Sequence, residues 1–134
     1  MDQALYTENA SKKKNVKFCN KYYTIPQSYH NIVKLKLSTN KYCLLSVYND
    51  KQERLLNESL SKLTQLKSLD CYLFNNIIYD TTIKHLTKLV FLDCGEKSII
   101  MDNTLMKLTN LEALHCNKNI YFFDRGLLHL TKLT

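Results

Sequence analysis

Side chains that could do chemistry recur at a nearly constant interval in the second half of this 134-residue chain. Asp70, Asp93 and His115 lie 23 and 22 residues apart. Each of the three is followed directly by a cysteine: Cys71, Cys94 and Cys116. Two carboxylates beside an imidazole can bind a metal ion or transfer protons, and neighbouring thiols can bind zinc or form a redox pair. Which chemistry is available depends on how the fold places them.

A repeated motif must position these residues. L-T-x-L-x-x-L-x-C starts at Leu63, Leu86 and Leu108, and begins again at Leu130. A period in the twenties with leucine at every third place predicts a repeat architecture. Because side chains alternate along a strand, the last Leu and the Cys of the motif share one face. We predict three interior columns: Leu66, Leu89 and Leu111; Leu69, Leu92 and Leu114; and Cys71, Cys94 and Cys116.

The same alternation predicts an outward surface that binds a partner. Its rows are Ser68, Phe91 and Ala113; Asp70, Asp93 and His115; and Tyr72, Gly95 and Asn117. Exposed aromatic residues are enriched at interface hot spots, and Asp70 and Asp93 favour a basic segment of a partner protein. The alternative is that Phe91 packs on neighbouring strands while the two aspartates keep the sheet soluble.

We predict no catalytic residue, no metal ion and no cofactor. The chain has no glycine-rich phosphate loop and no nucleophile beside a base, and an open sheet offers no pocket that excludes water. Zinc sites favour cysteine pairs a few residues apart, whereas these cysteines are more than 20 apart. Buried free cysteine behaves as a small apolar residue, which is the role we predict for the cysteine column.

The order of the elements divides the chain into three parts. Residues 1–14 are polar and predict a flexible tail, residues 15–41 an N-terminal cap, and residues 42–134 the repeats. The predicted repeats are 42–65, 66–88, 89–110 and 111–132, followed by an incomplete one. Alternating apolar residues predict a strand at Ile32–Leu37, which we expect to form a hairpin with Tyr42–Tyr48 and so close the end of the core.

Connections between the strands are predicted to be short, with one exception. Leu56, Leu60 and Leu63 are spaced by four and three, which predicts a helix over residues 50–63, with Asn49 or Asp50 as N-cap. Residues 75–83 and 97–105 mix β-branched and polar residues and predict short turns or 3₁₀ segments.

The motif resembles a known family. Leu111-x-x-Leu114-x-Cys116-x-x-Asn119 matches the leucine-rich-repeat (LRR) core L-x-x-L-x-L-x-x-N, with cysteine in the third apolar position. The period resembles the short internalin-like and phosphatase-regulator-like types. This resemblance implies an α/β solenoid: a right-handed superhelix with a concave parallel sheet and short convex connections, which binds proteins without being an enzyme. The family's Asn is replaced by Phe74 and Lys97 in the two earlier repeats.

A net charge of +7 raises a second hypothesis, binding to nucleic acid or another polyanion. All but Arg54 and Arg125 of the 19 basic residues are lysines, whereas arginine supplies the bidentate contacts that read bases. Lys, Asn, Ile and Tyr are abundant together and share AT-rich codons, so base composition can explain the charge. The sequence therefore favours a protein partner over nucleic acid.

An odd number of cysteines, five, and the lack of an export signal or an apolar span predict an intracellular protein, cytoplasmic or nuclear, that does not enter a membrane. A last group of core-type leucines has no strand after it: Leu127, Leu128, Leu130 and Leu133. We expect this uncapped end either to self-associate or to mark a truncated member of a repeat family with no independent activity.

Overall fold

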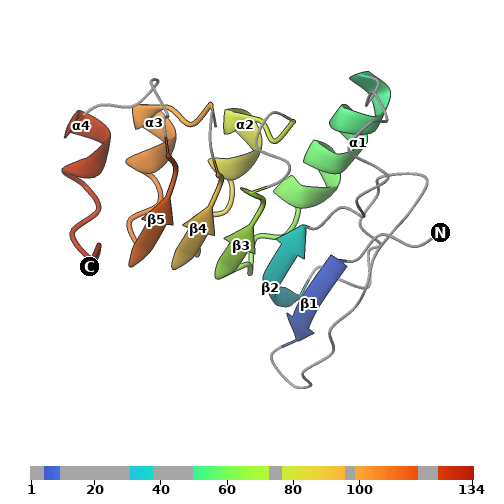
Figure 1. The fold of residues 1–134 in the computed structure, drawn as a ribbon, viewed down its shortest axis with the longest axis horizontal. Helices are drawn as coiled ribbons and strands as arrows, with labels where there is room; N and C mark the ends of the chain where they lie inside the picture. The colour runs from blue at the N-terminus through green and yellow to red at the C-terminus, as the bar shows by residue number, and fades with distance from the viewer. Residues whose placement is uncertain (1–4, 10–30, 38–49, 73–76, 96–98, 118–123) are drawn as a thin grey trace.

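The computed structural model describes residues 5–9, 31–37, 50–72, 77–95, 99–117 and 124–134. In this part of the chain five strands form one sheet in chain order: β1 (Leu5–Asn9), β2 (Ile32–Leu37), β3 (Ser68–Asp70), β4 (Phe91–Asp93) and β5 (Ala113–His115) (Figure 1). Strands β2 to β5 run parallel, and β1 pairs antiparallel with β2. The predicted α/β class with a parallel sheet is therefore confirmed.

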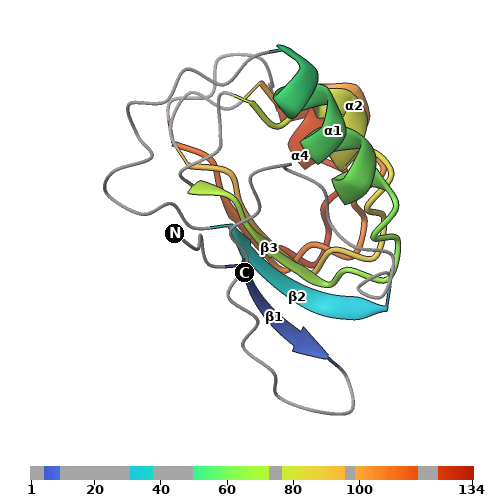
Figure 2. The same ribbon diagram turned by 90° about the vertical axis from the view of Figure 1, so that its right-hand side faces the viewer.

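Helices lie together on one side of this sheet (Figures 1 and 2). They are α1 (Asp50–Ser61), α2 (Asp80–Ile83), α3 (Asp102–Leu105) and α4 (Asp124–Leu127). The predicted long helix is confirmed as α1, and it ends at Ser61 because a turn begins there. The later connections are short, as predicted, but each is one turn of α-helix, with bonds such as the Ile83 N–H to the Tyr79 carbonyl at 3.2 Å.

Each helix is followed by two consecutive hydrogen-bonded turns, which lead into a strand after α1, α2 and α3. After α1, the Leu63 N–H donates to Leu60 O at 3.0 Å and the Leu66 N–H to Leu63 O at 2.9 Å. The same two bonds follow α2, α3 and α4, with these donors: Leu86 and Leu89, Leu108 and Leu111, Leu130 and Leu133. The L-T-x-L part of the motif is thus a turn whose two leucines point inward while its Thr-x tip faces outward.

Strands β3, β4 and β5 stack in register as the motif predicts. Leu69 pairs with Leu92 and Leu92 with Leu114, and the first two of these side chains are fully buried. The backbone bond that starts each strand also recurs, from the Val90 N–H to Lys67 O at 2.7 Å and from the Glu112 N–H to Val90 O at 2.8 Å. These columns and their flanking leucines form the core between sheet and helices.

The predicted flexible tail is wrong at Leu5–Asn9, which forms strand β1. It pairs with β2 from Leu5↔Leu37 to Asn9↔Ile32. A strand edge presents unpaired backbone N–H and C=O groups, and β1 satisfies those of β2 on the side away from β3. The polar residues that predicted a tail are compatible with an edge strand.

The predicted strand at Ile32–Leu37 is confirmed as β2, whereas its predicted hairpin partner, Tyr42–Tyr48, is not among the described residues. Among the described residues, β2 pairs with β1 on one edge and with β3 on the other. Leu35 pairs with Leu69, so the parallel sheet begins at β2. The 34 residues from Leu35 to Leu69 exceed the period of the motif because they include the long helix α1. Our counting assumed a constant period, which this longer helix breaks.

None of the helices in the described ranges combines the length and apolar character that crossing a bilayer requires.

Candidate functional site

The outer face of the sheet, turned away from the helices, carries the predicted surface residues. Ser68, Phe91 and Ala113 are partners in adjacent strands, which is the first predicted row. Asp70, Asp93 and His115 form the second. The register therefore places both rows as the motif predicts.

Asp70 differs from Asp93 because it already has a basic neighbour. Its Oδ2 lies 2.6 Å from Lys36 Nζ, and its Oδ1 accepts the Tyr72 N–H at 3.3 Å. Lys36 stands directly opposite Asp70 in the β2–β3 register. Sequence reasoning missed this ion pair because it placed Ile32–Leu37 in a hairpin rather than beside β3. The outer face is thus less acidic than two free aspartates would make it.

Asp93, in β4, contacts His115 in the neighbouring strand β5. Its Oδ2 lies 3.5 Å from His115 Nδ1, and its Oδ1 accepts the Gly95 N–H at 2.9 Å. Phe91 meets His115 edge to face, with ring centroids 5.4 Å apart and planes at 80°. Phe91 is only partly exposed, so it both packs on the neighbouring strand and reaches the surface.

Tyr72 stands at the edge of the same face, with 47% of its surface exposed. It lies against Gly95, whose φ of 64° is one that residues with a side chain rarely adopt. A Cβ at position 95 would fall 2.7 Å from the Tyr72 carbonyl oxygen and 2.9 Å from Tyr72 Cδ2. Gly95, the second residue of the third predicted row, is buried, and its lack of a side chain leaves room for Tyr72.

Tyr72, Asp93 and His115 line a hollow of about 470 Å³ at the carboxyl ends of β3, β4 and β5. Its lining consists of Tyr72, Asp93, Gly95, Leu114, His115, Cys116 and Asn117. An aromatic face beside a carboxylate is suited to a cationic group, which gains both a cation–π contact and a charge-assisted hydrogen bond. Ser68, Asp70, Phe91 and Ala113 lie outside this lining and form the surrounding surface.

The cysteines of the column lie one residue beyond the ends of β3, β4 and β5. Within the described ranges, no group of three His, Cys, Asp or Glu side chains is placed to hold a metal ion. Among the described residues, Cys71, Cys94 and Cys116 form no disulfide. Burial, together with the charges of Asp70 and Asp93, raises the pKa of Cys71 well above that of an ordinary thiol. Cys71, the first residue of the cysteine column, therefore packs in the core as a small apolar residue.

Cys116 is different, because it is only partly buried. A hydrogen bond with the Cys94 side chain lowers the pKa of Cys116, and this effect outweighs the partial burial, which acts in the opposite direction. The Cys94 thiol carries a single hydrogen, which it donates either to Cys116 Sγ or to the His115 carbonyl oxygen, 3.3 Å from Cys94 Sγ. Cys116 also lines the hollow of about 470 Å³.

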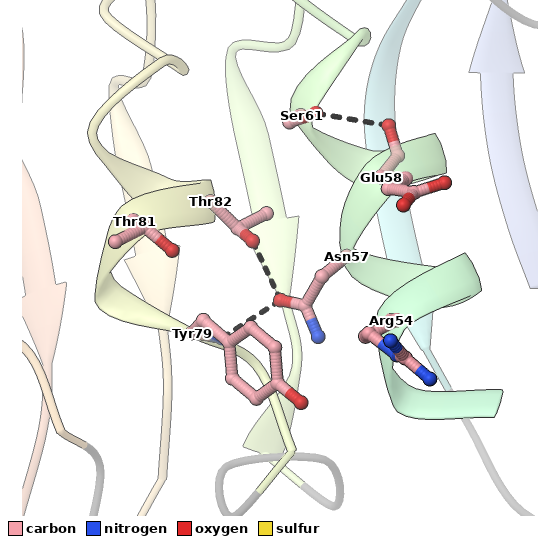
Figure 3. Close-up of a pocket in the computed structure, with 7 residues that line it drawn as sticks. All are labelled: Arg54, Asn57, Glu58, Ser61, Tyr79, Thr81 and Thr82. Atoms are coloured by element: carbon pink, nitrogen blue, oxygen red, sulfur yellow. Dashed lines mark hydrogen bonds between the residues drawn. The ribbon is translucent and has the colours of Figure 1, made fainter. Parts of the chain in front are cut away.

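A second hollow, of about 210 Å³, lies between α1 and α2 on the helix side (Figure 3). Its centre is Asn57, a buried amide that sequence reasoning missed. The Asn57 amide nitrogen donates to Ile77 O at 2.6 Å and to Glu53 O at 2.8 Å. Its oxygen accepts the Tyr79 N–H at 2.8 Å and the Thr82 hydroxyl at 2.6 Å.

All the hydrogen-bonding capacity of the Asn57 side chain is thereby used, so it joins α1 to α2 and leaves nothing for a ligand. Asn57 lies between Leu56 and Leu60 on the buried side of α1. The sequence contained one signal of this role: Asn57 is a polar residue on the apolar side of an amphipathic helix.

Among family models, curated proteins and solved structures, no match to this chain was found.

Proposed function

We propose that this chain is a leucine-rich-repeat-type solenoid that binds another protein through the outer face of its sheet, the concave face of that family, and catalyses no reaction. Support for the repeat comes from three parallel strands in equivalent register, each preceded by the same two turns. Asn119, the position that matches the family's asparagine, lies outside the described residues.

The observation that carries the binding role is the hollow between Tyr72, Asp93 and His115. Aromatic residues on a rigid sheet can contact a partner at little entropic cost, since the strands hold them in place. Because Asp70 is paired with Lys36, Asp93 is the carboxylate we expect to meet a basic side chain of the partner. Phe91 and the edge of His115 would extend the contact along the sheet.

The proposal includes the cell compartment in which the protein meets its partner. Free cysteines in a packed column suit a reducing environment, so we propose a cytoplasmic or nuclear partner.

A pull-down from the native cells tests the proposal. The outer-face variant, Tyr72→Ala with Asp93→Lys, should lose a protein that the wild-type chain retains. Its matched control is Tyr79→Ala with Glu58→Lys, which changes an exposed tyrosine and an exposed acid on the helix side. Equal retention of the partner by both variants would place the interface elsewhere.

A further inference from the structure

The double turns that lead from each helix into the next strand form a basic edge. Figure 2 shows these segments passing from the helices down to the sheet along one side of the molecule. The tips of the turns, which we call the turn edge, are residues 61–62, 64–65, 84–85, 87–88, 106–107, 109–110, 128–129 and 131–132. They include five lysines and two histidines: Lys62, Lys84, Lys88, Lys107 and Lys132, with His85 and His129. None of these tips carries a carboxylate.

Side chains of the turn edge are ordered from one repeat to the next. Lys88 Nζ donates to Gln65 Oε1 at 2.6 Å, and Lys132 Nζ donates to Asn110 Oδ1 at 2.9 Å. Asn110 in turn donates from its amide to Thr87 O at 3.2 Å. None of the edge lysines forms an ion pair with another residue in the described ranges. Their charges thus face solvent in rows whose spacing is that of neighbouring strands, ~4.8 Å.

Carboxylates are concentrated at the other end of the helices. Each short helix begins with an aspartate: Asp80, Asp102 and Asp124. Two of these accept backbone N–H groups of the following repeat, Asp80 from Met101 at 2.8 Å and Asp102 from Gly126 at 3.1 Å. Because the turns follow the helices, the aspartates at the starts of the short helices and the lysines of the turn edge lie at opposite ends of each helix.

The composition of the edge indicates its partner. Lysine, threonine, asparagine and glutamine are the side chains that contact phosphate and sugar in nucleic-acid complexes. The edge has no arginine to read bases and no Phe, Tyr or Trp to stack on them. Leu128 is the only strongly exposed large apolar residue at the tips, so the surface lacks the anchors of a protein hot spot. We propose that the turn edge binds the phosphate backbone of nucleic acid without regard to base sequence.

This site is separate from the outer face of the sheet, and its test is independent of the proposed protein partner. The full chain is titrated into a short fluorescein-labelled oligothymidylate and into a labelled duplex, with anisotropy read at several salt concentrations. The edge variant is Lys62→Gln, Lys88→Gln and Lys107→Gln. The control is Lys51→Gln, Arg54→Gln and Arg125→Gln, which removes the same charge from the helix side. Circular dichroism checks that both are folded.

We expect the edge variant to bind the single strand at least about tenfold more weakly at moderate salt, and its log Kd against log salt slope to fall by about 2, since each lost phosphate contact removes about 0.7. The control should bind nearly as well as the wild type. Three results would overturn the proposal: no saturable binding at low salt, equal weakening in both variants, or competition by poly-glutamate as strong as by nucleic acid of equal charge.

Discussion

Asp93 is the residue on which the proposed recognition depends most. Its neighbour in the sheet, Asp70, is matched to Lys36 at 2.6 Å, whereas Asp93 faces His115 and the open hollow. Two residues that look equivalent in the repeat are therefore unequal in the fold, and the difference comes from β2, a strand outside the regular period. Reversing the charge of Asp93 should consequently weaken a protein partner more than reversing that of Asp70.

The thiols of Cys116 and Cys71 allow a test of the core packing at the scale of single residues. In the folded protein, iodoacetamide should alkylate Cys116 well before Cys71, because Cys116 is partly exposed with a lowered pKa while Cys71 is buried with a raised one. A lower pKa places more thiolate at a given pH, so the Cys116 rate should rise at lower pH than that of an ordinary thiol. Peptide mass spectrometry reads each site. Similar rates at both sites without denaturant would contradict the packing described for this column.

Much of this residue-level arrangement could be predicted from the sequence. The period and the alternation of side chains give the rows and columns of β3 to β5. Lys36, Gly95 and Asn57 could not be assigned their roles in the same way. Their partners lie in elements whose pairing no local pattern encodes, and Gly95 matters for its backbone angle rather than for its side chain.

At the scale of elements, α1 and α2 are joined through one amide. Asn57→Ala would leave Tyr79 N–H and Ile77 O without their partner in a buried place, which should lower the free energy of unfolding by about 2–4 kcal/mol. Urea unfolding measures this, with Glu58→Ala on the exposed side of the same helix as control. If the two variants unfolded at the same urea concentration, Asn57 would not be the joint between the helices.

The stacked leucines make a second prediction for the elements. Leu92 is fully buried between its equivalents in β3 and β5, so Leu92→Ala should cost about 2–5 kcal/mol of unfolding free energy. Lys88→Ala, an exposed change four residues away, should have little effect. Coincident denaturation midpoints for the two variants would refute the assignment of this column to the core.

At the scale of the molecule, the chain presents two surfaces of different chemistry. The outer face of the sheet combines aromatic rings with a carboxylate, and the turn edge gathers lysines on the adjoining side. The α/β class and the parallel sheet were predictable because a single motif repeats. Strand β2 was predictable from its alternating apolar residues, but its place beside β3 was not, since β2 belongs to no repeat and a twelve-residue helix separates it from the motif.

Photocrosslinking tests the central claim most directly. A benzoylphenylalanine placed at Tyr72 reports on the outer face, and the same probe at Tyr79, another exposed tyrosine, reports on the helix side. In the native cells, the account predicts a discrete protein adduct from position 72 and none from position 79. Adducts of the same protein from both positions, or from position 79 alone, would contradict recognition through the outer face of the sheet.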